Sequence, residues 1–329
     1  MKKERNASID LLRIVLMLGV LIIHTCAHGL GLSKLSEGTY TGNQYSYLLI
    51  VMQSFSIVAV DVFFIISGYF TGELKARKIV EFYIMGGLYC SLAYVVSTIA
   101  GYNTFSILSF GRRALQGFTN YWFLTAYVII FLFSPFIVKL LDSLDDKQLK
   151  RLILTYVLVN TLFGYLLSSV TYGSGFSVDA MLFCYILGYG IRRFNWTFSC
   201  KDKSVNFLCY LVPVVFISAF GCAAYSIGKQ EFSYQIFDDY RNPIIIFASV
   251  ACFCLFARSI KIKNASIAKI VTEAGGGYAG SLLNDRHIRY KSSRIRSNCK
   301  SNGKQCSSLG AWTDNCGVLH CCLDFVYMF

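Results

Sequence analysis

The fold class follows from the first apolar run of the chain, residues 9–28, which reads IDLLRIVLMLGVLIIHTCAH. A helix needs about 20 predominantly apolar residues to cross the hydrocarbon layer of a bilayer. The run is continuous rather than alternating, which favours a helix over a strand of a membrane barrel. It contains Asp10 and Arg13 and lacks a small-x-small cleavage site. We therefore interpret it as an uncleaved membrane anchor and not as a signal peptide.

Similar runs recur along the chain. Its 329 residues are 55% hydrophobic and 15% charged, whereas a soluble domain is about a quarter charged. The sequence therefore predicts an all-α membrane protein, a polytopic helical bundle with about eight transmembrane helices. We expect these helices near residues 9–28, 47–70, 80–100, 121–141, 152–170, 177–191, 205–227 and 242–260.

The distribution of basic residues predicts the orientation of the bundle. If the N-terminus is cytoplasmic, most lysines and arginines fall in cytoplasmic segments, as the positive-inside rule requires. The exceptions in the outside loops are Lys34, Arg112, Arg113, Lys229 and Arg241. The net charge of +13 is then largely explained by cytoplasmic loops, and no nucleic-acid-binding module is recognisable. We expect a multi-pass protein that binds the lipid bilayer and no nucleic acid.

The composition changes near Gly275. Residues 1–272 consist of apolar runs and short loops, whereas residues 273–329 are polar, basic and without helical periodicity. We therefore divide the chain into a transmembrane domain, 1–272, and a tail, 273–329. Two interpretations of the tail stay open: a disordered basic appendage, or a segment translated out of the original reading frame.

The first run holds the densest set of ionisable residues, and such residues inside a membrane span are functional candidates. Arg13 and His24 are almost three helical turns apart, so they share one face and are separated by about 16 Å along the axis. Asp10 lies one turn before Arg13 and can pair with it. An arginine fork suits phosphate groups, and a neutral imidazole away from water suits general-base catalysis on a hydroxyl. The alternatives are a snorkelling Arg13 and a hydrogen-bonded structural His24.

Two further features of the spans carry chemistry. His28 lies one turn after His24, at a spacing that metal-binding histidines use, but no third ligand is evident and we expect no metal. Asp61 lies inside the second run, where a carboxylate should face the bundle interior and meet Arg13, His24 or a hydroxyl group. A catalytic role and a structural ion pair remain open for Asp61. Ser67-Gly68 favours close helix packing.

Other polar and aromatic positions have simpler interpretations. Trp122 is typical of an interfacial anchor, and Pro135 of a kink or an exit from the span. Asp238, Asp239 and Arg241 fall in an outside loop, where solvated side chains are the default, although they could meet an acceptor. Cysteines within the spans are interpreted as small packing residues.

These segments together resemble the membrane-bound acyltransferase-3 family of bacterial acyltransferases over about the first 270 residues. The resemblance begins with Asp10-Leu-Leu-Arg13, ten intervening residues and His24. It continues through the Asp61-Val-Phe-Phe-Ile-Ile-Ser-Gly-Tyr69 block and includes Trp122-Phe-Leu, Ser134-Pro135 and Leu187-Gly188. The spacing of arginine and histidine becomes specific when the aspartate block of the next helix is added.

The resemblance implies transfer of an acyl group, usually acetyl, from acyl-CoA to a hydroxyl of a surface polysaccharide or cell-wall glycan. It places the protein in the bacterial inner membrane. It assigns His24 to the transfer step and Arg13 to holding the CoA end of the donor. We take His24 and Asp61 as candidate catalytic residues, Arg13 as the candidate donor-binding residue, and acetyl-CoA or another acyl-CoA as donor substrate.

Two rival hypotheses remain. The first is a transporter or flippase that moves a glycan or lipid without chemistry, in which Asp61 and His24 form a proton relay. The second is an inactive remnant, because the family's closing helices are replaced here by a blurred echo, Gly277-Tyr-Ala-Gly-Ser-Leu-Leu-Asn-Asp285.

Overall fold

The computed structural model describes residues 6–71, 76–101, 103–116, 122–167, 175–195, 203–262 and 264–276. All regular elements in these ranges are helices, which confirms the predicted all-α class. The predicted tail lies almost wholly outside the described residues.

The helices are α1 (Ala7–His24), α2 (Ser46–Ser56), α3 (Val58–Phe70), α4 (Ala76–Ile99), α5 (Ile107–Gln116), α6 (Trp122–Ser143), α7 (Asp146–Val159), α8 (Val178–Arg193), α9 (Lys203–Ser226), α10 (Gln230–Asp238), α11 (Pro243–Cys254) and α12 (Ala265–Gly276).

Three short π-helical turns extend longer helices. They are η1 (Thr25–Gly29) after α1, η4 (Asn160–Leu166) after α7 and η6 (Leu255–Ser259) after α11, and a 3-10 helix, η2 (Leu32–Glu37), follows η1. Turns of this kind often occur at functional sites. The start of α1 is defined locally, because Asn6 caps its first turn by accepting a hydrogen bond from the Ser8 amide.

Six helical segments of the described chain are long and apolar enough to span a membrane. They are Ala7–Gly29, Ser46–Phe70, Trp122–Ser143, Asp146–Leu166, Lys203–Ser226 and Gln230–Ser259. The expected count of about eight is therefore not confirmed. The apolar stretch of α4, Gly86–Ile99, is shorter, and α8 has only 16 residues. The chain is a multi-pass helical protein. Pro135 lies inside α6 and does not end it.

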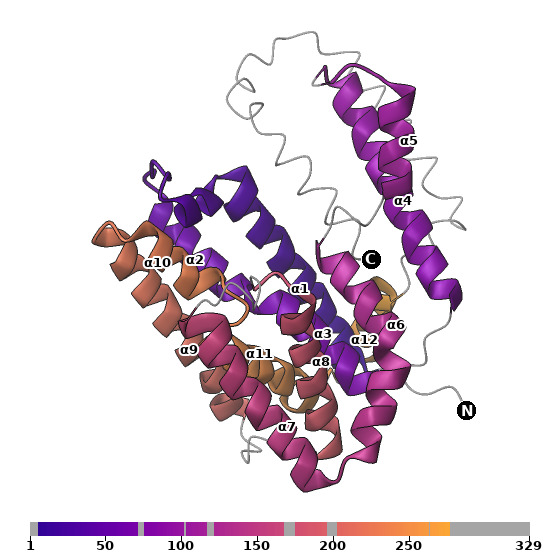
Figure 1. Ribbon diagram of the computed structural model, residues 1–329, viewed down its shortest axis with the longest axis vertical. Helices are drawn as coiled ribbons and strands as arrows, with labels where there is room; N and C mark the ends of the chain where they lie inside the picture. The colour runs from indigo at the N-terminus through magenta and orange to yellow at the C-terminus, as the bar shows by residue number, and fades with distance from the viewer. Residues whose placement is uncertain are drawn as a thin grey trace.

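The centre of the bundle is α3, which packs against α8, α11 and α1 (Figure 1). Gly68 of α3 lies against the backbone carbonyl of Tyr185, and Gly188 of α8 lies against the carbonyl of Ile65. A methyl group at either glycine would overlap that backbone, so the two helices approach as closely as small residues allow. The packing interpretation of Ser67-Gly68 is confirmed.

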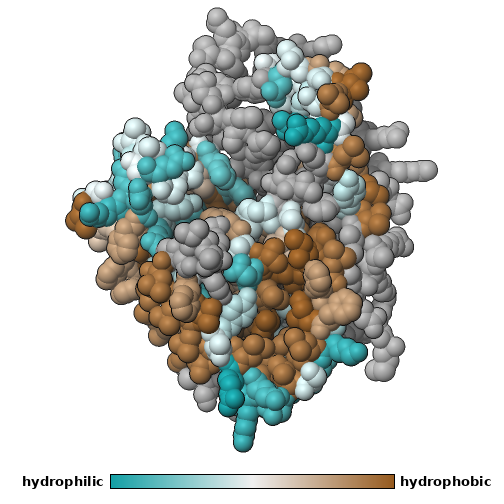
Figure 2. Space-filling model, viewed as in Figure 1, coloured by the Kyte–Doolittle hydropathy of each residue, from teal (hydrophilic) through white to brown (hydrophobic). Residues whose placement is uncertain are grey.

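The helices α4 and α5 form a hairpin that stands beside the bundle in Figure 1. They pack on each other, and the Arg113 guanidinium lies over the ring of Tyr94, 5.3 Å from its centroid. Figure 2 shows apolar side chains over much of one face of the bundle, with hydrophilic side chains gathered toward its ends. Exposed apolar residues such as Phe136, Leu140 and Leu166 are what a lipid-facing surface requires.

Candidate active site

The two polar positions of the first span are carried by one uninterrupted helix. Arg13 and His24 both lie in α1, so their axial separation is about 16 Å. The Arg13 Nη1 group donates to Oδ1 of Asp10 at 2.7 Å, and the predicted pair is confirmed. Asp10 is 2% exposed and Arg13 34%, so the pair holds the guanidinium at the edge of the bundle. Arg13 also interacts electrostatically with Tyr127 of α6, whose hydroxyl hydrogen-bonds Ser67 of α3.

His24 ends α1 and is partly buried. Its ring stacks on that of His28, with centroids 5.7 Å apart and an interplanar angle of 26°. His28 belongs to the π-helical turn η1 and is exposed. In the part of the chain that the structure describes, no group of three histidine, cysteine or acidic side chains is arranged to hold a metal ion.

Asp61 lies in the first turn of α3 and is fully buried. Its Oδ2 atom accepts a hydrogen bond of 3.2 Å from the Ser249 hydroxyl of α11, and the Cys184 thiol of α8 hydrogen-bonds the same carboxyl group. Of the three partners considered from the sequence, the structure provides a hydroxyl. Asp61 faces α8 and α11, and within the described residues it contacts neither Arg13 nor His24.

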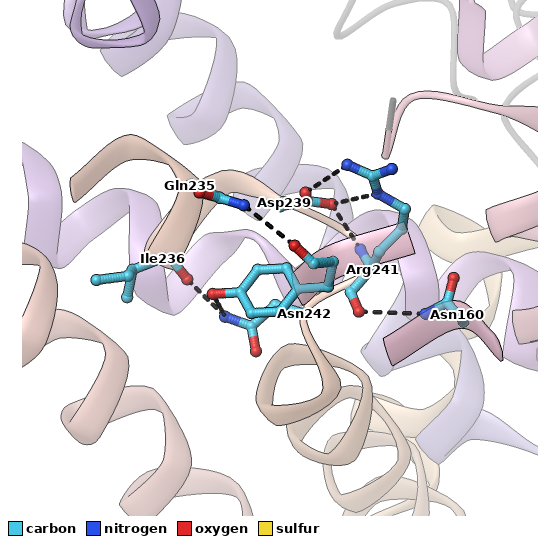
Figure 3. A network of polar contacts seen from close by, with 7 residues as sticks. Asn160, Gln235, Ile236, Asp239, Arg241 and Asn242 are labelled. Atoms are coloured by element: carbon cyan, nitrogen blue, oxygen red, sulfur yellow. Dashed lines mark hydrogen bonds and ion pairs between the residues drawn. The ribbon is translucent and has the colours of Figure 1, made fainter. Parts of the chain in front are cut away.

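The interpretation of residues 238–242 as a solvated loop is wrong. Asp238, Asp239 and Arg241 are 4%, 9% and 6% exposed. The carboxylate of Asp239 receives Arg241 Nη2 at 2.7 Å and Nε at 3.0 Å, and it also accepts the Arg241 backbone amide at 2.9 Å. This bidentate geometry is the strongest form of the arginine–carboxylate pair. We call residues 238–242, which join α10 to α11, the polar corner (Figure 3).

Neighbouring helices are tied to the polar corner by hydrogen bonds. Gln53 of α2 donates to Asp238 at 2.6 Å, and Asn160 of η4 donates to the Arg241 carbonyl at 3.1 Å. Asn242 donates to the Ile236 carbonyl at 2.8 Å and caps α11 by accepting the Ile244 amide. These bonds satisfy backbone groups that a helix–turn–helix corner leaves open. The sequence signal that could have revealed the corner is its place between two helices of one apolar segment, Gln230–Ser259.

Aromatic rings flank the polar corner. Trp122 lies 5.5 Å from Tyr240 and 5.1 Å from Phe176, and the rings of Phe176 and Tyr240 are 5.2 Å apart. Trp122 is partly buried against the main core and is the first residue of the candidate span Trp122–Ser143, so its role as an interfacial anchor stays a prediction. Phe176 is 40% exposed, so the aromatic group beside the corner reaches the surface of the molecule.

The fold and the buried polar groups of its spans define a multi-pass α-helical membrane protein. The comparison with protein families identifies the kind of membrane protein. The model of the acyltransferase domain of the acyltransferase-3 family matches residues 6–275. The chain therefore belongs to this family of membrane acyltransferases. No curated protein and no solved structure matches the chain.

Proposed function

We propose that this protein transfers an acetyl group from acetyl-CoA to a hydroxyl of a cell-surface polysaccharide or of its glycan precursor. The observation that carries the proposal is the placement of Arg13 and His24 on one helix of a family acyltransferase domain. One residue suits the phosphates of the donor and the other suits proton transfer at the acceptor.

Arg13 is the donor-binding residue in this proposal. Its guanidinium is one-third exposed and held by Asp10, so it can meet an anionic ligand that approaches the end of the bundle. CoA carries its thioester at the end of a long arm that starts from phosphate groups. A phosphate site at Arg13 and a reaction site near His24, about 16 Å away along the axis, suit such a donor.

His24 acts as the general base. Its imidazole takes the proton of the acceptor hydroxyl as that oxygen attacks the thioester carbonyl. The carbon–sulfur bond then breaks, CoA leaves as its thiolate, and the proton passes from the imidazole to the sulfur. Asp61 has a separate place in the interior, because its partners are on α8 and α11.

Transfer of label tests the reaction. Membranes that contain the protein are incubated with acetyl-labelled CoA and with surface polysaccharide from a strain that lacks the gene. Label should appear in the polysaccharide, and the His24→Ala variant should remove it. A transporter would transfer no label, and that result would contradict the proposed reaction.

We also propose the inner membrane as location, with a cytoplasmic N-terminus, because the basic residues follow the positive-inside rule. Ser36 of η2 and Lys147 of α7 are both exposed and lie at predicted opposite sides. In a cysteine-free background, an impermeant thiol reagent should label Ser36→Cys from outside and leave Lys147→Cys unlabelled until the membrane is opened. Labelling of Lys147→Cys alone in intact cells would reverse the orientation.

A further inference from the structure

Four buried oxygen atoms of the described chain have no hydrogen-bond partner there. They are Gln53 Oε1, Asp61 Oδ1, Asn160 Oδ1 and Ser177 Oγ. Gln53 and Asp61 are fully buried, and Asn160 is 1% exposed. Buried polar atoms in folded proteins are nearly always paired, so a group of unpaired acceptors requires an explanation.

The four oxygens lie at different distances from the polar corner, and Asp61 lies deeper than the corner, because its partner Ser249 is about 10 Å along α11 from Asn242. Gln53 and Asn160 each donate to the corner through their amide nitrogens, which leaves their oxygens available. Asp61 interacts electrostatically with Asp239. Ser177 follows Gly175, which lies against the Asp239 carboxylate and the Tyr240 amide, and Phe176, whose ring contacts the Tyr240 ring. Two of the unpaired oxygens, those of Gln53 and Asn160, therefore belong to side chains that bond directly to the corner.

The chemistry of this group favours a ligand rich in hydroxyl donors. Carboxylate and amide oxygens accept hydrogen bonds. Beside them lies the ion pair of Arg241 and Asp239, whose charges are held in place. Trp122, Phe176 and Tyr240 supply ring faces and edges at the same place, on which apolar ligand surfaces pack. A sugar combines hydroxyl donors with apolar C–H faces.

The polar corner also lies at the same end of α1 as His24. Gly19 of α1 packs on Ser56 and Ala59. Measured along the helix axes from this contact, His24 on α1 and Gln53 on α2 both lie about 5–8 Å away, toward the same end of the bundle. Cys26, two residues after His24, shares a hydrophobic cluster with Ile50 and with Phe237, which precedes Asp238. A glycan that is bound at the corner could therefore extend toward His24.

We propose that the polar corner, with the unpaired oxygens of Gln53 and Asn160, forms a carbohydrate subsite that binds the acceptor glycan. The inference rests on the proposed function and adds a location for the acceptor. Asn160 is the position that tests the subsite most directly, because it combines a buried unpaired oxygen with a bond to the corner.

The test compares Asn160→Leu with a matched control, Asn206→Leu. Asn206 is also a buried asparagine, 5% exposed, and donates to Ser259 on η6, away from the corner. In the labelled transfer assay, Asn160→Leu should raise the KM for polysaccharide about threefold to tenfold, the effect of a lost hydrogen bond. Its KM for acetyl-CoA should stay within twofold, and Asn206→Leu should leave both values unchanged.

A second readout separates this inference from the proposed reaction. Oligosaccharides released from the same polysaccharide are titrated against the purified full chain in nanodiscs, and tryptophan fluorescence is followed. Saturable quenching that is lost in Trp122→Phe and weakened in Asn160→Leu supports the subsite, even if the wild type transfers no label. Normal polysaccharide affinity in a folded Asn160→Leu protein, or a lower kcat with an unchanged KM, would overturn it.

Discussion

The stripe of polar residues on α1 and the polar corner between α10 and α11 each contain an arginine–aspartate pair with a buried aspartate, but the two arginines differ in exposure. Both pairs have a closest contact of 2.7 Å. The Arg13 side chain is 34% exposed and that of Asp10 is 2%, whereas the side chains of Arg241 and Asp239 are 8% and 10% exposed. The first arginine is available to a ligand, and the second is a fixed part of the interior. Equal distances therefore do not imply equal roles.

The largest expected effect is the loss of transfer in His24→Ala. Without a general base, the rate of acetyl transfer should fall about 10²–10⁴-fold. His28→Ala should have a smaller effect, because His28 is exposed and contacts His24 only through ring stacking. The measurement is labelled acetyl transfer, normalised to the amount of membrane-inserted protein. Equal losses at both positions would indicate a shared structural role and would remove His24 from proton transfer.

The next effect concerns stability, at the polar corner. Arg241→Ala leaves the Asp239 carboxylate buried without its partner, which should lower the free energy of unfolding by about 3–5 kcal/mol. The double variant Asp239→Asn/Arg241→Gln removes both charges and should recover part of that loss. Denaturant unfolding of the purified protein in detergent measures both changes. A loss below about 1 kcal/mol in Arg241→Ala would show that the corner is solvated after all.

The difference between the two regions also explains which of their features could be predicted from the sequence. The α1 stripe was predictable because the helix period places Asp10, Arg13 and His24 on one face, and the apolar run fixes that period. The burial of Asp239 and Arg241 was not predictable in the same way. The segment that carries them is held by hydrogen bonds from Gln53 to Asp238 and from Asn160 to the Arg241 carbonyl, across 185 and 81 residues of the chain. Local periodicity carries no information on such contacts.

The predicted number of spanning helices is not confirmed within the described residues, and a related physical reason applies to one of them. The run at 177–191 is apolar because α8 packs against the centre of the bundle, where nearly all its residues from Ala180 to Ile191 are buried. Burial in protein and burial in lipid select similar side chains. Composition alone therefore predicted a full span where the structure has a helix of 16 residues.

A smaller effect is expected for Arg13→Lys, which keeps the charge but loses the planar fork that binds phosphate oxygens in pairs. The KM for acetyl-CoA should rise about threefold to tenfold, the cost of one charge-assisted hydrogen bond. The KM for polysaccharide should stay unchanged, because the proposed acceptor subsite is elsewhere. An unchanged KM for acetyl-CoA in Arg13→Ala would remove Arg13 from the donor site.

The smallest effect separates the two ion pairs directly. Asp10→Asn keeps the shape of the side chain and removes the charge that holds Arg13. Because Arg13 is one-third exposed, its guanidinium can turn toward water or lipid phosphate after the change, so the free energy of unfolding should fall by less than about 1 kcal/mol. The same substitution at Asp239 should cost several times more, since Arg241 has no such exit. Denaturant unfolding of Asp10→Asn and Asp239→Asn in the same detergent gives the comparison. Equal losses at the two positions would mean that Arg13 is as confined as Arg241, and a confined Arg13 could not receive the phosphates of CoA.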